Sequence, residues 1–599
     1  MKQGQVIKQI IVKKGIQEIK LDKIYPVEPL KNQGINQVTY MVDDTKSESE
    51  PFYANLLLID SNTDDLKLDI ICAKGYVAQE EPKWNKLFLK SSGWSGGDGI
   101  FSFNMENGND SFDQDYQGKT LFVFGDTFVG KSNPVTKNRL QPHLMPNNTI
   151  GYLENGKVDF KINWQKDGSV SGFYKMDPKF DNEGTIALNL INYDHKEKNM
   201  GWLSGYNPKK VELIFDLFKE RKISHIEFYN YFSEEDDILA QRGLKDIEIL
   251  GSHDKKVWEL ISQNTLKMST SKQDKEIISI EKTFQFIKVV AAAKKGIGNY
   301  NQKGYKEGLY GLNLIKFFNG SQQYRDLYVE SSSTLLKNPE HSWIWLQDGV
   351  VIGNHLYFIP IVINSDLNQP EGLQFCVKGA ALFKTPISNS KLVTAKSTQK
   401  MAPLLVEKDG SQWLFGNALM ANTVQSGAKN PDGYIYIYGY KSTMGLRELV
   451  LARVKEENFE FFDDWKFFDG QTWNSDIFSS QPLLGHISCE MSVSQLLDGG
   501  NKGKYIAVYT YDTNTPYIAF SLADHPWGPF SNPQKIYHTP EQAKFKSTTY
   551  TYNAKAHPHL SNSKEILVTY NTNTYNFDHN MSSYLIYRPR FIRLLDTTK

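Results

Sequence analysis

The feature that most constrains the fold is a strand hairpin that recurs five times along the chain. Each copy combines a short apolar strand, a turn containing Gly, Asn or Lys, and a second strand rich in β-branched and aromatic residues. The second strands are GKTLFVFGDT (118–127), GNHLYFIPIV (353–362), GSQWLFGNAL (410–419), GKYIAVYTYD (503–512) and SKEILVTYNT (563–572). Repeats at such intervals are typical of the blades of a β-propeller, although five unrelated hairpins of a β-sandwich remain an alternative.

The first and second copies are much further apart than the others. The first begins at residue 118 and the second only at residue 353, which leaves room for an insert of about 150 residues, the size of a domain. The insert contains strand-like segments at 210–217, 224–232, 245–252, 284–293 and 311–318. The first strands of the five hairpins are expected at 99–103, 348–352, 401–407, 491–497 and 556–561.

We therefore predict an all-β protein: a five-bladed β-propeller with an inserted β-sandwich and an N-terminal β-rich segment. The expected parts are an N-terminal lead-in segment (1–90), blade 1 (91–166), the inserted sandwich (167–320) and blades 2 to 5 (321–599).

The charge balance excludes several classes of partner. Lys and Arg together number 68, and so do Asp and Glu, which argues against binding to nucleic acid or to an anionic membrane. The three cysteines, Cys72, Cys376 and Cys489, have neither a disulfide pattern nor metal-ligand spacing. No apolar run is long enough for a signal peptide or a membrane span. We expect a cytoplasmic protein as the sequence stands, or a secreted one if a leader has been removed. The oligomeric state is not predicted.

The densest chemical signal is a pair of aspartates in the first hairpin. Asp98 precedes the strand GIFSF, and Asp126 follows the strand TLFVF directly. If these strands are consecutive and antiparallel, the start of the first lies beside the end of the second, so both carboxylates reach the same end of the blade. Two such carboxylates are what glycoside hydrolysis requires, one to donate a proton and the other to act as base or nucleophile. Alternatively, each aspartate only caps a turn.

The first hairpin also carries a family resemblance. GWSGGDGIFSF (93–103), LFVFGDTFVG (121–130) and MPNNTIGYL (145–153) resemble the first blade of bacterial five-bladed propeller families that are related to the endo-D-arabinanases. WIWLQDGVVIGNHLYFIP (343–360) resembles their second blade. The resemblance covers about 350 residues of the chain and implies that Asp98 and Asp126 are catalytic.

A second resemblance concerns the insert. NMGWLSGYNPKKVELIFDL (199–217), SHIEFYNYF (224–232) and DIEILGSHDKKVWEL (246–260) resemble a discoidin-like carbohydrate-binding sandwich.

Glu490 is a third candidate acid. More distant propeller glycosidases carry their general acid as a glutamate on a later blade, and Glu490 begins the inner strand of the fourth blade. Its apolar neighbours Cys489 and Met491 would raise its pKa. A buried glutamate that is satisfied by a neighbouring arginine or by the backbone is the alternative.

Further residues are candidates for holding substrate, and each has a structural alternative. The tryptophans could stack on sugars or pack in the core, the asparagines could hold hydroxyls, Asp348 could tune a nearby acid or cap a turn, and His557 could lie near an ion or be an ordinary buried histidine. These candidates are Trp94, Asn147, Asn148, Trp343, Trp345, Asp348, Asn553 and His557. We predict no cofactor and no catalytic metal, with a structural ion such as calcium as an open alternative.

The sequence thus predicts a glycoside hydrolase that acts on an oligo- or polysaccharide, possibly a furanose-containing one such as an arabinan or fructan. Two alternatives stay open: a non-catalytic glycan-binding protein, and a glycan phosphorylase or transglycosylase. The acid pair favours an enzyme over a lectin, and the lack of clustered Arg and Lys near the first hairpin disfavours a phosphorylase.

Overall fold

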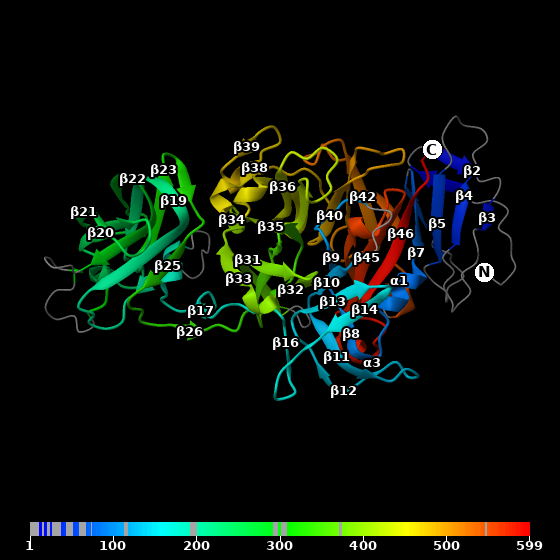
Figure 1. Cartoon of the computed structure of the whole chain (residues 1–599), viewed down its shortest axis with the longest axis horizontal. Coiled ribbons are helices and arrows are strands. Elements are labelled where there is room, and N and C mark those ends of the chain that lie inside the picture. Colours follow the sequence, from blue (N-terminus) through cyan, green and yellow to red (C-terminus); the bar gives the residue numbers. More distant parts are fainter. Residues whose placement is uncertain are drawn as a thin grey trace.

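The computed structural model describes residues 75–112, 118–191, 201–291, 298–300, 308–369, 374–545 and 548–598. Before them it gives the backbone of six strands, β1 (Ile11–Lys14), β2 (Gln17–Lys20), β3 (Ile24–Pro26), β4 (Val38–Val42), β5 (Phe52–Leu58) and β6 (Leu68–Ala73). Strands dominate throughout (Figure 1), so the all-β class is confirmed. The α-helices of the described part are short, α1 (Pro82–Leu87), α2 (Glu541–Lys544) and α3 (Phe577–Ser582), and none is long and apolar enough to cross a membrane.

Five antiparallel sheets occupy the centre of the molecule. Sheet 1 consists of β9 (Phe101–Asn104), β10 (Thr120–Phe124), β13 (Thr149–Glu154) and β14 (Lys157–Lys161). The main strands of sheet 2 are β28 (Gly349–Ile352), β29 (His355–Phe358), β30 (Ile361–Ser365), β31 (Phe375–Ser388) and β33 (Thr398–Ala402), with β27 (Trp343–Trp345) at its edge. Sheet 3 consists of β34 (Leu405–Lys408), β35 (Ser411–Asn422), β36 (Tyr434–Thr443), β37 (Leu446–Lys455), β38 (Lys466–Phe468) and β39 (Trp473–Asn474).

Sheets 4 and 5 complete this set. Sheet 4 consists of β40 (Met491–Gln495), β41 (Tyr505–Thr510), β42 (Tyr517–Ala523) and β43 (Gln534–His538). Sheet 5 consists of β44 (Thr549–Ala556), β45 (Glu565–Thr574), β46 (Pro589–Asp596) and β7 (Tyr76–Glu80). Strands β10 and β41 are buried along their whole length, which explains their nearly continuous apolar sequence. Gly353 and Gly410 lie in hairpin turns at positive φ of 56° and 77°, where glycine is favoured.

The five sheets contact one another in cyclic order. Strand β9 contacts β28, β28 contacts β35, β35 contacts β40, and β40 contacts β44. Sheets 5 and 1 are connected through His557, which follows β44 directly and shares a hydrogen bond of 2.7 Å with Ser102 of β9. One strand of each sheet therefore takes part in these contacts between sheets.

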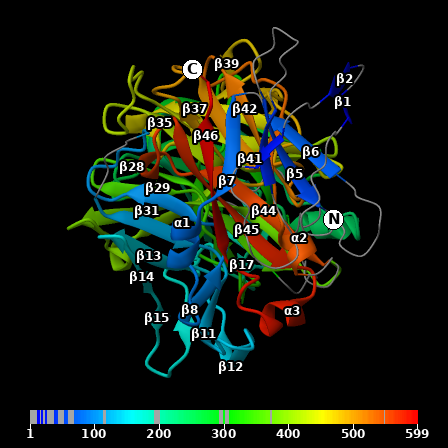
Figure 2. The ribbon, with the colours of Figure 1, turned by 90° about the vertical axis from the view of Figure 1, so that its right-hand side faces the viewer.

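Strand β7 joins the two ends of this arrangement. It pairs with β46 from Tyr76↔Asp596 to Glu80↔Ile592, as the edge strand of sheet 5 (Figure 2). The predicted N-terminal segment, 1–90, included these residues. Strand β7 instead belongs to sheet 5. The sequence did not predict this, because pairing between distant parts of a chain leaves no local sequence signal.

The hairpin predictions are confirmed for sheets 1, 2 and 4, where the expected strands pair in order. In sheet 3 the predicted hairpin also forms, but β35 rather than β34 contacts the neighbouring sheets. In sheet 5 the first strand is Thr549–Ala556, not 556–561 as expected. The expected segment instead forms a short 3-10 turn at Pro558–Leu560, since a proline removes a backbone donor.

The inserted unit has a sheet and a core of its own. Its sheet contains β18 (Trp202–Leu203), β19 (Val211–Asn230), β20 (Asp246–Ser252), β21 (Glu259–Thr265), β22 (Glu276–Ala291), β23 (Gly311–Asn319), β24 (Gln322–Tyr324) and β25 (Tyr328–Ser331). Two predicted strands, 210–217 and 224–232, are one strand, β19, which pairs along its length with β22. Phe218, at φ 59°, interrupts the pairing, so both halves of β19 can bury their apolar side chains in one core.

The bounds of the insert differ from the predicted 167–320. Strand β17 (Asn182–Glu183) enters the unit and pairs with β26 (Asn338–Pro339), which leaves it. Before β17, the side chains of Tyr174 and Phe180 pack in the core between sheets 1 and 2. In Figure 1 the unit lies at one end of the molecule and the N-terminal strands at the other.

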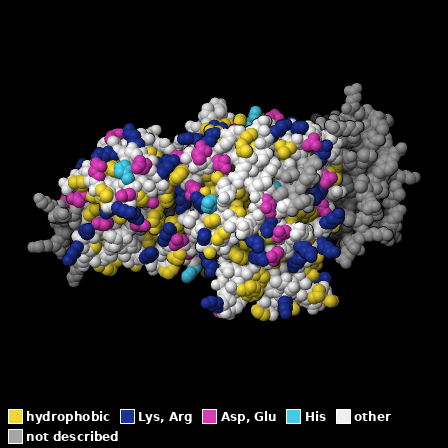
Figure 3. Space-filling model, in the orientation of Figure 1, with side chains coloured by type: hydrophobic (Ala, Val, Ile, Leu, Met, Phe, Trp, Pro, Cys, Tyr) yellow, Lys and Arg dark blue, Asp and Glu magenta, His cyan; other side chains and the backbone are white. Residues whose placement is uncertain are grey.

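Buried charges connect the insert to the central sheets. Arg221 of β19 donates a hydrogen bond of 3.0 Å to Asp464, which follows β37 in sequence. In the other direction, Lys400 of β33 donates to Asp326 of the insert at 2.8 Å. On the face of the molecule shown in Figure 3, basic and acidic side chains are interspersed over both parts.

Candidate active site

The backbone brings Asp98 and Asp126 together. Asp98 lies between β8 (Ser92–Gly97) and β9, and Asp126 between β10 and β11 (Thr127–Ser132). The amide of Asp98 donates to the carbonyl oxygen of Asp126 at 3.3 Å, and the amide of Gly125 donates to that of Asp98 at 2.8 Å. A Cβ at Gly125 would lie 2.7 Å from Oδ1 of Asp98, so this close approach requires glycine. The structure thus places both predicted acids at one end of sheet 1.

The surroundings of Asp98 favour its protonated form. Burial raises the pKa of this carboxyl, and the negative charges of Asp126 and Glu490 raise it further. Two tyrosines oppose this effect: Tyr552 donates to Oδ2 at 2.8 Å, and the hydroxyl of Tyr587 also interacts with the carboxylate.

Asp126 is buried, and a hydrogen bond favours its charged form. Burial raises its pKa, whereas Asn147 and Trp345 lower it. Nδ2 of Asn147 donates to Oδ1 of Asp126 at 3.3 Å. These two predicted substrate-binding residues therefore belong to the acid site.

Glu490 lies at the same place. A Cβ on Gly99, the residue after Asp98, would be 3.6 Å from Oε1 of Glu490 and 3.6 Å from the amide of Gly125. Glu490 is 5% exposed and pairs with Lys555, which is 1% exposed. Glu490 therefore lies beside the backbone of the acid pair, and a buried cation is its partner.

The sequence prediction missed the residues that hold Glu490. Lys555 lies in the buried strand β44, where a charged residue is unusual without a partner, and that was the available signal. Gln347 precedes the predicted Asp348, and its Nε2 donates to Oε1 of Glu490 at 3.2 Å.

Two buried amide groups beside Glu490 have oxygen atoms without a donor. Gln347 is 3% exposed and Asn417 2% exposed. Nδ2 of Asn417 donates to the carbonyl oxygen of Cys489 at 2.7 Å. Oε1 of Gln347 and Oδ1 of Asn417 accept no hydrogen bond within the described chain. Because a buried acceptor without a donor is costly, these oxygens are candidates to accept a hydroxyl group.

Three predicted ligand residues are structural instead. Trp94 is buried and stacks on Phe160, with ring centroids 4.2 Å apart. Asn148 is buried, and its amide exchanges two hydrogen bonds with the backbone of Tyr174. His557 uses both ring nitrogens, Nδ1 with Ser102 (2.7 Å) and Nε2 with Thr569 (2.8 Å), and burial lowers its pKa. All three side chains therefore make contacts within the fold.

None of the remaining predicted residues makes a described hydrogen bond with the acid pair. Asp348 accepts hydrogen bonds from the amides of Leu419 (2.7 Å) and Gly349 (2.8 Å), and burial raises its pKa to about 8. Asn553 is buried in a bulge of β44 at φ 59°. Trp343 is half-buried in β27.

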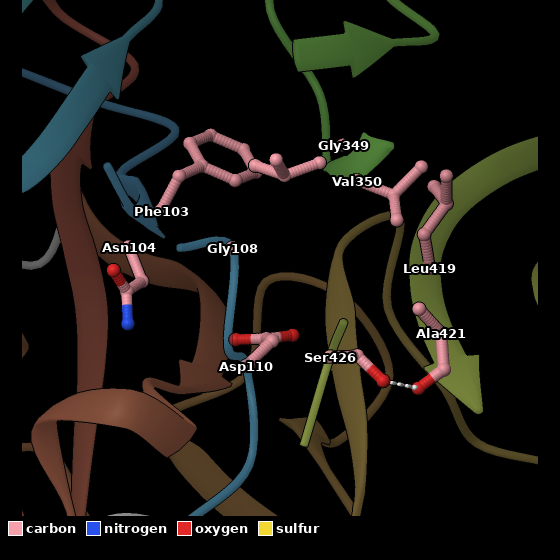
Figure 4. A pocket seen from close by; sticks show the side chains of 10 residues that line it. Phe103, Asn104, Gly108, Asp110, Gly349, Val350, Leu419, Ala421 and Ser426 are labelled. Carbon is pink, nitrogen blue, oxygen red and sulfur yellow. Dashed lines mark hydrogen bonds between the residues drawn. The ribbon is translucent and has the colours of Figure 1, made fainter. Parts of the chain in front are cut away.

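A separate pocket lies near the end of β9 that is distant from Asp98 (Figure 4). Phe103, Asp110 and Leu419 are among the residues that line it, and Ser426 Oγ donates to the carbonyl oxygen of Ala421 at 2.7 Å. Asp110 is the only carboxylate of this lining, so the pocket does not have the acid pair that hydrolysis requires.

Among the described residues, no group of three or more His, Cys, Asp or Glu side chains is placed to hold a metal ion.

Comparison with known families gives one match. The model of a family described as a domain of unknown function, DUF5005, matches residues 312–596. This range contains the strands of sheets 2 to 5 apart from β7. A comparison with curated protein sequences found no match.

Solved structures give more distant likenesses. A Bacteroides ovatus protein provisionally named as a hydrolase is 14% identical, with 89% of this chain and 97% of that one covered, at a TM-score of 0.45. A family 32 carbohydrate-binding module from a Clostridium perfringens family 31 glycoside hydrolase is 12% identical, with 24% and 95% covered, at 0.17. The GH43_1 enzyme from Xanthomonas citri is 12% identical, with 41% and 87% covered, at 0.18.

Proposed function

We propose that the five sheets are the blades of a five-bladed β-propeller and that the protein is a glycoside hydrolase, with Asp98 and Asp126 as its central acids. The observation that carries this proposal is the acid pair itself, joined through its backbone and flanked by the charged Glu490.

The two aspartates have different roles in this proposal. Asp98 has two negatively charged neighbours, which makes it the carboxyl that keeps a proton and donates it to the leaving glycosidic oxygen. Asp126 accepts a hydrogen bond from Asn147 that stabilises its carboxylate form, which suits a base that activates water or a nucleophile that attacks the anomeric carbon. The pair titrates as a unit, since the charge of one raises the pKa of the other.

Glu490 is assigned a supporting role. Its carboxylate is buried against Lys555 and accepts a hydrogen bond from Gln347, so it has the partners of a charged group. A fixed negative charge at this position favours the protonated form of Asp98. This differs from the sequence-based hypothesis in which Glu490 is the proton donor.

We propose that the substrate is an oligo- or polysaccharide, with arabinan- and fructan-like furanosides as the first candidates. The reaction needs no cofactor, because the two carboxyl groups supply both the proton and the base. We also propose that the insert is a discoidin-like carbohydrate-binding sandwich. Trp202 lies in the segment 199–217, which carries part of this resemblance. Its side chain is buried and donates a hydrogen bond to the carbonyl oxygen of Ser333, so this tryptophan supports the fold of the unit and not its ligand.

The test is a hydrolysis screen on arabinan, levan, xylan and their short oligosaccharides, with products identified by NMR. The expected result is cleavage of at least one substrate, which Asp98→Asn and Asp126→Asn abolish. Binding of a glycan without any cleavage would support the non-catalytic alternative, and cleavage that depends on phosphate would support a phosphorylase.

A further inference from the structure

Two exposed aromatic side chains follow β45 closely in the sequence, and each is linked to the acid pair through a series of ring contacts. Tyr575 is 42% exposed and Phe577 is 53% exposed. Among the described residues, the only other exposed aromatic side chains are Trp164 and Tyr206. Single exposed apolar residues are ordinary on a protein surface, but two on one loop beside an acid site require an explanation.

A first series of ring contacts leads from Asp98 to Tyr575. The hydroxyl of Tyr552 donates to Asp98, and the ring of Tyr552 lies 5.3 Å from that of Tyr550. The ring of Tyr550 in turn stacks on that of Tyr575, with centroids 4.4 Å apart and planes inclined by 29°. Burial raises the pKa of Tyr550, and the charges of Tyr575 and Asp98 raise it further.

A second series leads from Asp98 to Phe577. Tyr587 interacts with Asp98 through its hydroxyl, and its ring meets Phe128 edge-on at 5.2 Å. Phe128 contacts Phe577 at 5.9 Å. Arg139 lies over Phe128, 3.9 Å from its centroid, and fixes that ring from another side.

The loop that carries the two exposed rings is held in place. The amide of Tyr575 donates to the carbonyl oxygen of Thr548 at 3.1 Å, and Nδ2 of Asn514 donates to its hydroxyl at 3.3 Å. The side chain of Asn576 caps α3 by accepting from the amide of Asp578 at 2.9 Å. A surface that is ordered before binding loses less entropy when a ligand binds.

We propose that Tyr575 and Phe577, supported by Tyr550, form an aromatic platform on which a glycan chain stacks beyond the sugar that is cleaved. This inference rests on the proposed function and names its substrate class: a chain that extends several sugars from the scissile bond, rather than a single glycoside. A tyrosine or phenylalanine ring offers a flat, rigid, apolar face to the C–H face of a sugar, while sugar hydroxyls stay in water. The platform is continuous with the acid site through both series of rings.

The test compares a long and a short substrate of the same sugar. The polysaccharide that the wild-type protein cleaves best among arabinan, levan and xylan is assayed beside the 4-nitrophenyl glycoside of its sugar. The variants are Tyr575→Ala, Phe577→Ala and the conservative Tyr575→Phe, and the control is Trp164→Ala on the hairpin of β15 (Asn163–Trp164) and β16 (Val170–Ser171). Retention of the polysaccharide by Asp126→Asn, alone and combined with Tyr575→Ala, is measured by affinity gel electrophoresis.

Loss of one stacking ring is expected to raise KM for the polysaccharide about tenfold, the effect of roughly 1.4 kcal/mol. The ratio of kcat/KM for the polysaccharide to that for the short glycoside then falls by a similar factor in both alanine variants. Tyr575→Phe and Trp164→Ala keep the wild-type ratio. The combined variant migrates freely in gels that retard Asp126→Asn.

An unchanged ratio in both alanine variants would overturn the platform while leaving hydrolysis by the acid pair intact. If the wild-type protein cleaves nothing, the proposed function fails, and gels that contain arabinan, levan or xylan, run with the wild-type protein and with Tyr575→Ala, still decide whether the platform binds glycan. If Phe577→Ala and Tyr575→Ala instead change only the oligomeric state, the rings are an interface between two copies of the chain and the proposal is wrong.

Discussion

The amide nitrogen of Asp98 donates a hydrogen bond to the carbonyl oxygen of Asp126, so the two carboxylates start from backbone atoms already in contact. Mutual repulsion then separates their titrations, because two adjacent carboxyl groups do not both ionise readily. An acid and a base can thus coexist at one pH.

Asp98→Asn and Asp126→Asn should each lower kcat by about three orders of magnitude, the usual effect of removing a general acid or base. Wild-type activity should rise as pH increases through the pKa of Asp126 and fall as it increases through that of Asp98. Each variant should lose one side of this profile while its Tm stays near the wild-type value. If both variants keep near-normal rates and Glu490→Gln is inactive, the reaction centre lies on sheet 4.

A comparison of sequence and structure shows where prediction was possible. Asp98 and Asp126 flank two strands of one hairpin, so alternation and turn residues were enough to bring them together. Lys555, Gln347 and Asn417 reach the site from sheets 5, 2 and 3, and no local pattern encodes contacts between sheets.

Two strand pairings could not be predicted from local sequence patterns either. The pairing of β7 with β46 joins residues from distant parts of the chain. In β19, the residues around Phe218 contain polar side chains that resemble a turn in the sequence, although β22 pairs with both halves.

The stability of the folded protein should depend on Glu490 and Lys555 as a pair rather than on either residue alone. Lys555→Met leaves a buried carboxylate without its cation, which should cost about 3–5 kcal/mol of unfolding free energy. The double variant Lys555→Met with Glu490→Gln should recover much of this loss, since no buried charge remains. Urea denaturation of the two variants measures the difference. Equal instability of the single and double variants would contradict a role for charge.

Removing the charge of Glu490 should also lower the pKa of Asp98. Because this charge raises the pKa of Asp98, Glu490→Gln should move the fall of activity to lower pH. Glu490→Asp, which keeps the charge, is the control. An unchanged alkaline side in Glu490→Gln would exclude this electrostatic coupling.

The free amide oxygens of Gln347 and Asn417 should contribute to substrate recognition. Asn417→Ala and Gln347→Ala should lower kcat/KM by about tenfold each, the effect of one lost hydrogen bond to a neutral group. With the wild-type protein, a substrate that lacks the recognised hydroxyl should show the same loss of kcat/KM. With the variant, removing that hydroxyl should lower kcat/KM no further. Kinetics on deoxy analogues of the cleaved sugar measure both effects. Additive losses for variant and analogue would show that the amide does not contact that hydroxyl.

Asp348 should make stability depend on pH. Burial raises its pKa to about 8 in the folded protein, whereas an unfolded aspartate titrates near about 3.9. Between these values the folded state binds more protons than the unfolded state, so stability should fall as pH rises through this window and then level off. Asp348→Asn should flatten the curve of Tm between pH 5 and 9. Asp110→Asn, which removes a nearby charge that also raises this pKa, should flatten it only slightly. An identical curve for Asp348→Asn and the wild type would rule out this origin.

Deletion of the insert should leave the central sheets folded. Strands β17 and β26 pair where the chain enters and leaves the unit, with Glu183 opposite Asn338. Replacing residues 184–337 by Asn-Gly would therefore close a two-residue hairpin, a connection that antiparallel strands favour. The deletion also removes Asp326, the partner of Lys400, and Arg221, the partner of Asp464, so Tm should fall by several degrees. Lys400→Met in the shortened protein should recover part of this loss by removing the unpaired cation. Activity on a short glycoside should persist, because the acid pair lies on sheet 1 and its partners on sheets 2 to 5. If the shortened protein folds but no longer cleaves that substrate, the insert forms part of the active site.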